Sequence, residues 1–257
     1  MALNVHSFGD ADGRPVVALH GVRGHGARWR RLAERHTTGL HVLGLDLRGH
    51  GRSPWTPPWT LEQHAADVLE TMDDQGLEAV DLVGHSFGAT VAIVVADQAR
   101  DRIRRLVLLD PGIALDPGYV LGRVQQELVP ASFPDAAAAG LERASQWPGL
   151  TDATVVDEEI LDHLDRDEDG LWRWRYNAAA VVTAFSEMTR PAPVPPPGLP
   201  TLLVVATKGS AVGPRFLAAI EDTPDLDVTV VGVDSGHTVY VDRPEETGAL
   251  VQDFLSR

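Results

Sequence analysis

The sequence of 257 residues contains no cysteine. Disulfide bonds, thiolate nucleophiles and cysteine-rich metal sites are therefore excluded. The chain also lacks any uncharged apolar run of about 18 residues, the length that a membrane-spanning helix requires. We therefore expect no stable insertion into a membrane.

The N-terminus lacks the marks of a secretory signal. Residues 1–15, MALNVHSFGDADGRP, contain neither a basic segment nor an apolar one. We therefore expect a cytoplasmic location.

Positive charge is scarce: 22 Lys and Arg residues stand against 37 Asp and Glu residues, for a net charge of −15. A surface of this sign repels nucleic-acid phosphate and anionic lipid headgroups, so we expect no nucleic-acid partner. Many of the acids lie in residues 152–169, which we interpret as a solvated helix face. The run lacks the turn glycine that an EF-hand loop for calcium requires.

Short apolar segments alternate with helical patterns along most of the chain. The expected strands are residues 16–20, 41–46, 79–84, 103–109, 202–206 and 228–233, and the expected helices are residues 28–35, 60–75, 89–99 and 245–255. Strands that are apolar throughout and separated by helices predict an α/β fold, with a mostly parallel sheet covered on both faces. Functional residues of such sheets gather at the carboxyl ends of the strands.

Residues 112 to about 190 interrupt this alternation with a helical-looking block that has no strong strand. The block ends at a proline-rich stretch, RPAPVPPPGLP, which predicts a stiff, extended connector. We therefore predict a core formed by residues 1–111 and 199–257, with a helical lid inserted at residues 112–198.

Three tryptophans of this predicted lid, Trp147, Trp172 and Trp174, suit an acyl pocket and internal packing equally well. None is assigned to a site on sequence alone. We find no internal repeat.

The motif Gly84-His85-Ser86-Phe87-Gly88 follows a predicted strand and precedes a predicted helix. A tight strand-to-helix turn of this kind exposes the serine hydroxyl, and the flanking glycines allow backbone and helix to approach closely. The amino end of the helix adds N–H donors near developing negative charge. Ser86 is therefore the candidate nucleophile.

His237, in the sequence Ser235-Gly236-His237, follows the last predicted strand. An imidazole takes up and returns a proton near neutral pH, as a general base must. Among the other histidines, only His163 also follows Ser86 with sequence between, and it lies in the acidic part of the predicted lid. His237 is therefore the candidate base.

A glycine-rich turn, His20-Gly21-Val22, follows the first long predicted strand. A turn there can direct a backbone N–H into the site. We expect the Val22 amide and the Phe87 amide, which follows the nucleophile, to form an oxyanion hole.

The segments VALHG at 17–21, LDLRGHGRS at 45–53, GHSFG at 84–88 and SGH at 235–237 together resemble the α/β-hydrolase superfamily over nearly the whole chain. The stretches HGVRGHGARWRRLAE and LVLLDPGIALD are similar to actinobacterial lipases and esterases. The resemblance implies an α/β-hydrolase fold and serine-dependent ester hydrolysis.

The acid of the expected triad departs from the commonest pattern of this superfamily. Many members carry an aspartate after the strand that follows the lid, but Gly209 or Ser210 occupies that position here. Another branch places the acid directly after the strand that precedes the lid, where this chain has Asp110. That residue is our candidate for the group that orients the histidine ring.

Alternatives to Asp110 remain open on sequence alone. Asp116 lies nearby, whereas Asp234 is too close to His237 in the chain to reach behind its ring easily. A Ser–His dyad without an acid is a further alternative.

The sequence thus predicts a carboxylesterase or lipase acting on a small-molecule ester with a short or medium acyl chain, through an acyl-enzyme and with no metal or organic cofactor. The acid-rich lid favours soluble esters. Thioester hydrolysis, C–C bond hydrolysis, lyase chemistry and a slow ligand receptor use the same scaffold and stay as alternatives. The sequence does not define the oligomeric state.

Overall fold

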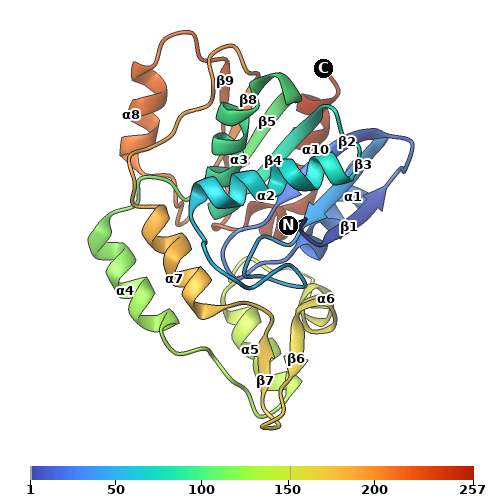
Figure 1. The fold of residues 1–257 in the computed structure, drawn as a ribbon, viewed down its shortest axis with the longest axis vertical. Helices are drawn as coiled ribbons and strands as arrows, with labels where there is room; N and C mark the ends of the chain where they lie inside the picture. The colour runs from blue at the N-terminus through green and yellow to red at the C-terminus, as the bar shows by residue number, and fades with distance from the viewer. Residues whose placement is uncertain (1, 151) are drawn as a thin grey trace.

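The computed structural model describes residues 2–150 and 152–257, and it is built around a seven-stranded sheet (Figure 1). The strands are β1 (Val5–Gly9), β2 (Arg14–Leu19), β3 (Leu40–Leu45), β4 (Val80–His85), β5 (Ile103–Leu109), β8 (Thr201–Ala206) and β9 (Val228–Val233), in the spatial order β1-β3-β2-β4-β5-β8-β9. All pairs are parallel except β1 with β3. The predicted mostly parallel sheet is confirmed.

The register of the central strands determines which loops meet. His85 pairs with Leu109 across β4 and β5, and Leu109 pairs with Val204 of β8. The carboxyl ends of β4 and β5 are therefore level, and β8 continues past them to Ala206. Residues that directly follow β4 and β5 must lie side by side, as the candidate site requires.

Helices cover both faces of the sheet (Figure 1). One face carries α2 (Leu61–Asp74) and α3 (Phe87–Gln98), with Phe216 of α8 (Pro214–Asp222) in the same apolar cluster. The other carries η1 (Gly26–Trp29), α1 (Arg30–Arg35), α9 (Val239–Asp242) and α10 (Pro244–Leu255). A short turn of helix, η2 (Arg100–Arg102), leads into β5.

The start of α2 illustrates how the sequence defines a helix end. The Thr60 side chain accepts a hydrogen bond from the Gln63 N–H, so Thr60 is the N-cap that the sequence predicts. In contrast, α8 was not expected, although Pro214 at its first position is a common helix start.

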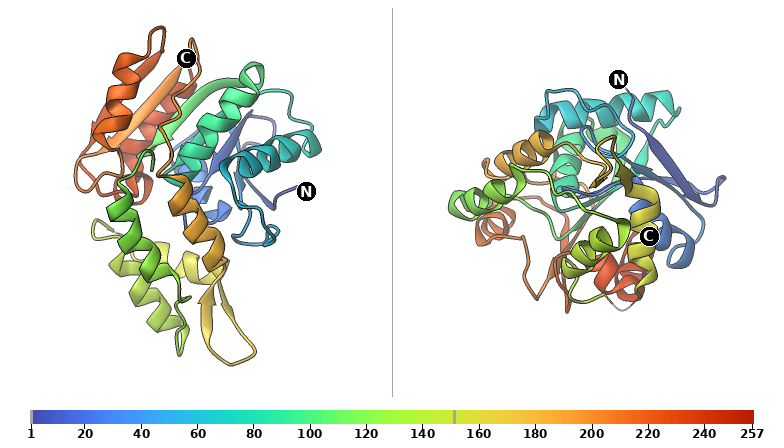
Figure 2. Two further views of the ribbon diagram at one scale, coloured as in Figure 1. Left: turned by 60° about the vertical axis from the view of Figure 1, so that its left-hand side comes forward. Right: turned by 90° about the horizontal axis from the view of Figure 1, so that it is seen from below.

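Between β5 and β8, the described part of the chain adds no strand to the main sheet. We call residues 112–198 the inserted segment; it contains α4 (Pro117–Glu127), α5 (Ala136–Ser145), α6 (Thr154–His163), β6 (Leu164–Arg166), β7 (Trp172–Trp174) and α7 (Ala178–Glu187). In Figures 1 and 2 it lies beyond one end of the sheet. Its assignment as a separate lid domain stays a prediction.

The inserted segment, expected to have no strong strand, contains two short strands that were not predicted. Strands β6 and β7 pair antiparallel as a hairpin, and each has only three residues. Strands this short leave no alternating pattern to detect. Within the described residues, no helix has the length and hydropathy of a membrane span.

Candidate active site

Ser86 lies in the turn between β4 and α3, with φ 53° and ψ −121°. A positive φ is costly for a residue with a side chain, so the surrounding packing must hold it in place. The flanking glycines permit this turn. A Cβ at Gly84 would lie 2.5 Å from the Ala89 Cα, and one at Gly88 would lie 2.4 Å from the Leu19 carbonyl oxygen.

His237 lies in the loop between β9 and α9, with its ring between Ser86 and Asp110. Its Nε2 is 2.9 Å from the Ser86 Oγ, and its Nδ1 is 2.6 Å from Oδ2 of Asp110. In the tautomer that fits both contacts, Nδ1–H donates to Asp110 and Nε2 accepts from the serine hydroxyl. The structure thus brings the three candidate residues into one hydrogen-bonded chain.

Asp110 is fully buried and accepts four hydrogen bonds. Besides His237, the donors are the Ala206 N–H at 2.9 Å, the Ser210 hydroxyl at 2.5 Å and the Ala211 N–H at 2.9 Å. Burial alone would raise the pKa of this carboxyl, but the hydrogen bonds from His237, Ser210 and Ala211 outweigh burial and lower it. Asp110 is therefore a carboxylate at neutral pH.

The other candidate acids make different contacts. Asp116 caps α4 by accepting the Tyr119 N–H, and Asp234 is exposed and pairs with Lys208 at 2.8 Å. Neither has a hydrogen bond to His237 among the described contacts.

Sequence analysis noted Ser210 but did not predict its contact. Ser210 is one of the two residues, with Gly209, considered for the position where the resemblance predicts an acid, and its hydroxyl donates to Asp110 after the neighbouring strand β5. The sequence does contain a signal for this contact: a residue with a small hydroxyl side chain at that position, together with an aspartate at position 110.

His85, inside the motif, supports the histidine loop. Its Nε2–H donates to the His237 carbonyl oxygen at 3.0 Å. Burial, together with the neighbouring His237, lowers the pKa of His85 to about 3, so the ring stays neutral and can donate only from one nitrogen. Sequence analysis did not assign this contact.

The two amides that we expect to form an oxyanion hole belong to residues near Ser86. A Cβ at Gly21 would lie 2.9 Å from the Ser86 Cβ, which shows how closely the turn after β2 approaches the serine. Val22 lines the same cavity as Ser86, and Phe87 begins α3. Within residues 2–150 and 152–257, neither amide donates a hydrogen bond to another group of the chain.

A cavity of about 720 Å³ opens beside Ser86 and His237. Apolar side chains dominate its wall: Val22, Ala114, Leu115, Phe185, Met188, Val212 and Pro214. The inserted segment supplies Leu115, Phe185 and Met188, which sequence analysis did not single out. The volume lies in the range of sites for small molecules.

The tryptophans considered for an acyl pocket lie elsewhere. Trp147 and Trp174 are buried against the Arg143 guanidinium, whose Cζ is 4.2 Å from the Trp174 ring centroid. Trp172 pairs with Phe133. None of the three lines the cavity beside Ser86, so their contacts are those of internal packing.

The acidic run is only partly the solvated face that we expected. Its end, Asp165, Asp167 and Asp169, is half-exposed around the hairpin. Its first part instead faces arginines of residues 23–31 in an arrangement that we call the ion-pair seam. The seam consists of Arg23–Glu142, Arg28–Glu159, Arg30–Asp162, Arg31–Asp152 and Arg31–Glu158.

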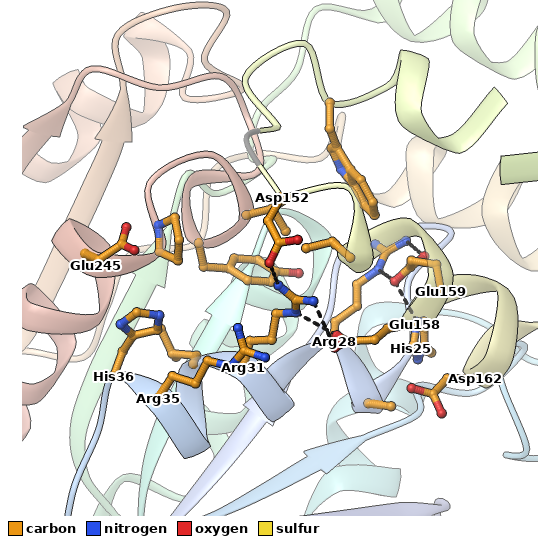
Figure 3. A pocket seen from close by; sticks show the side chains of 17 residues that line it. His25, Arg28, Arg31, Arg35, His36, Asp152, Glu158, Glu159, Asp162 and Glu245 are labelled. Carbon is orange, nitrogen blue, oxygen red and sulfur yellow. Dashed lines mark hydrogen bonds and ion pairs between the residues drawn. The ribbon is translucent and has the colours of Figure 1, made fainter. Parts of the chain in front are cut away.

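Glu159 is the buried centre of this seam, beside a small cavity of about 160 Å³ (Figure 3). It accepts from Nε of Arg28 at 2.6 Å and from Nε2 of His25 at 2.7 Å. Burial would raise the pKa of Glu159, but the positive charge of Arg28 and the hydrogen bonds from Arg28 and His25 lower it well below its usual range. The acids of the ion-pair seam hold the inserted segment against the core. Their number therefore does not indicate how polar the outer surface of the inserted segment is.

That outer surface is partly apolar. On and after α4, Tyr119, Leu121, Leu128 and Val129 are each more than half exposed. The argument that an acid-rich lid favours soluble esters therefore loses its basis.

The comparisons with known proteins agree with this architecture. Residues 16–250 match the model of the Alpha/beta hydrolase family. The chain is 36% identical to lipase LipV of Mycobacterium tuberculosis over 255 residues, covering 98% of this chain and 97% of the relative. It is 28% identical to the mouse sn-1-specific diacylglycerol lipase ABHD11, covering 96% of this chain and 83% of that protein.

Among solved structures, E-2-(acetamidomethylene)succinate hydrolase superposes with a TM-score of 0.84 at 22% identity, covering 99% of this chain and 95% of that one. At this identity the likeness concerns the fold. The fold, the order of the strands in the sheet and the family match together define the class of the protein, which is that of the hydrolases built on this α/β scaffold. The chain belongs to the α/β hydrolase family and is a hydrolase.

Proposed function

We propose that the protein is a serine carboxylesterase that cleaves esters of short to medium acyl chains through an acyl-enzyme. The observation that carries this proposal is the chain of hydrogen bonds from Ser86 through His237 to Asp110, at 2.9 and 2.6 Å. The relatives named lipases and the apolar cavity beside the serine support an ester substrate.

In the proposed first step, Nε2 of His237 takes the hydroxyl proton as the Ser86 Oγ attacks the ester carbonyl. The negative charge that develops on the carbonyl oxygen is stabilised by the N–H groups of Val22 and Phe87. Asp110 holds the ring tautomer and stabilises the imidazolium. The intermediate collapses as His237 gives the proton to the leaving alcohol, and the acyl group remains on Ser86.

In the second step, His237 takes a proton from water, and the resulting attack on the acyl-enzyme releases the carboxylic acid and restores Ser86. The cavity wall formed by Phe185 and Met188 would hold the acyl chain. In this proposal the inserted segment acts as a lid over the site.

The test is a series of p-nitrophenyl esters from acetate to dodecanoate, assayed with the wild type and with Ser86→Ala. We expect hydrolysis that is best for short or medium chains and that Ser86→Ala lowers by at least about 10⁴-fold. Equal rates for both proteins would contradict the proposal.

A fluorophosphonate probe separates the other reaction classes. If the wild type is labelled at Ser86 but cleaves no ester in the series, the serine is activated and the function is a thioesterase, another cofactor-free reaction or a receptor. If the wild type is not labelled, the proposed role of Ser86 is wrong.

A further inference from the structure

The turn that carries the Val22 amide is held by its own carbonyl groups. The Gly21 carbonyl oxygen accepts from Nδ1–H of His20 at 2.7 Å and from the Gly24 N–H at 3.1 Å. Because a trans peptide directs its C=O and N–H to opposite sides, fixing this carbonyl also fixes the Val22 N–H. Residues 21–24 thus form a four-residue turn whose geometry determines where the proposed oxyanion donor lies.

Arg23 occupies the third position of this turn with φ 61°. Positive φ at that position is usually taken by glycine or asparagine. An arginine there is costly for the backbone unless contacts elsewhere retain it.

The Arg23 side chain supplies such contacts, and all of them reach the inserted segment. Its Nη2 is 2.8 Å from Oε1 of Glu142 on α5, and its Nη1 is 3.5 Å from Oε1 of Glu127 on α4. Its Cζ lies 5.5 Å from the Tyr176 ring centroid. Only 13% of the side chain is exposed, so these contacts are shielded from water.

The backbone of Arg23 is tied as well. Its N–H donates to Nε2 of His50 at 3.3 Å, and its carbonyl oxygen accepts from Nη2 of Arg28 at 3.3 Å. Arg28 in turn pairs with Glu159 of α6. Three helices of the inserted segment therefore converge, directly or through one arginine, on a single residue of the turn.

We propose that Arg23 is a positioning residue. Its contacts with the inserted segment hold the Gly21–Gly24 turn in place, so that the Val22 N–H faces the oxyanion. The position of the inserted segment and the completeness of the oxyanion hole are then coupled. The inference rests on the proposed function, because it assumes that charge develops on an oxygen attached to the carbon that Ser86 attacks.

The test compares Arg23→Met with a matched control, Arg30→Met. Arg30 also pairs with the inserted segment, at 2.8 Å from Asp162, but it lies in α1 outside the turn. We expect Arg23→Met to lower kcat by about 10- to 100-fold, less than the loss of a whole oxyanion donor, with KM changed by less than about threefold. Arg30→Met should leave kcat within about twofold of the wild type.

Two more variants separate positioning from general damage. Arg23→Lys can still pair with Glu142 and should recover part of the lost kcat. Glu142→Gln should lower kcat by a few fold, and adding it to Arg23→Met should cost little more, because both remove the same contact. Melting curves confirm that each variant is folded.

The inference is overturned if Arg23→Met keeps the wild-type kcat, if its loss falls on KM alone, or if Arg30→Met loses as much kcat. The rate of fluorophosphonate labelling at Ser86 gives a second readout, since that reaction also builds charge on an oxygen in the same hole. If the wild type is labelled but cleaves no ester, the proposed function fails while the labelling rates still test Arg23. If it is not labelled at all, both fail.

Discussion

Two cavities of this protein, each walled partly by the inserted segment, have opposite chemistry. The cavity beside Ser86 is about 720 Å³ and mostly apolar, whereas the one in the ion-pair seam is about 160 Å³ and is lined by arginines and carboxylates (Figure 3). The first includes Val22, whose amide has no partner among the described residues, whereas in the second Arg28 and Arg31 pair with the carboxylates of residues 152, 158 and 159.

This difference indicates that the inserted segment has two roles, one in the wall of the cavity beside Ser86 and one in the ion-pair seam. Leu115, Phe185 and Met188 of the inserted segment contribute to the apolar wall near the serine, whereas α5 and α6 contribute carboxylates that dock on the core. We expect changes in the first cavity to alter rate and substrate range, and changes in the seam to alter stability.

The largest effect is expected from Asp110→Asn. The amide cannot stabilise the imidazolium and favours the wrong ring tautomer, so kcat should fall by about 10⁴-fold in an ester assay. The structure should remain folded, which circular dichroism checks. A near-normal rate would leave His237 without an orienting acid and would favour a Ser–His dyad.

Next comes Glu159→Gln in the seam. The change leaves the buried Arg28 without its counter-charge and should lower the free energy of unfolding by about 3–5 kcal/mol in a denaturant titration. The control is Asp162→Asn, which breaks the partly exposed pair with Arg30 and should cost about 1 kcal/mol or less. Equal costs for the two variants would contradict the view that Glu159 is the centre of the seam.

The pH dependence of the Glu159 contribution has a definite sign. The folded state lowers the pKa of this carboxyl, so its contribution to the free energy of unfolding is complete above the unfolded pKa of about 4.3 and declines as the pH falls below it. The difference in stability between wild type and Glu159→Gln should therefore shrink in acid. A difference that grows as the pH falls from 6 to 3 would show the opposite linkage.

A smaller effect is expected from Met188→Ala in the cavity beside Ser86. The Met188 Sδ lies 2.5 Å from the position that a Cβ of Gly112 would take, next to the Ser86 hydroxyl. Removing this side chain lengthens the space for an acyl chain and should shift the ratio of kcat/KM for long over short esters by about tenfold. An unchanged ratio would place the acyl chain elsewhere in the cavity.

Much of the fold could be predicted because the buried strands are continuous apolar runs. The predicted strand at 103–109 coincides with β5, and that at 202–206 lies within β8. Strand β1 was missed because it is a short edge strand with half-exposed residues, which gives it no apolar run. The same reason applies to the three-residue strands of the hairpin.

Part of the candidate site could be predicted because parallel strands end at one edge. Ser86 and Asp110 follow adjacent strands, so their proximity follows from strand order, and the place of His237 after the last predicted strand put it at the same edge. The contact of Ser210 with Asp110 and the contacts of Arg23 with the inserted segment could not be predicted from strand order. Each joins residues about a hundred positions apart, through side chains whose directions only the folded chain determines.

For the same reason, the sequence could not predict what the acidic run contacts. A helix rich in Asp and Glu is most often solvated, and nothing in residues 152–162 alone says that arginines at 28–31 lie opposite. Only the position of the inserted segment against the core makes those acids partners.

The most direct test of the account is to trap the acyl group on the enzyme. The wild type is mixed with excess p-nitrophenyl butyrate, quenched in acid within milliseconds and digested for mass spectrometry. The account predicts a butyryl group on the peptide that contains Ser86, and no such adduct in Ser86→Ala. Ester turnover with no acyl group on Ser86, or with one on another residue, would contradict it.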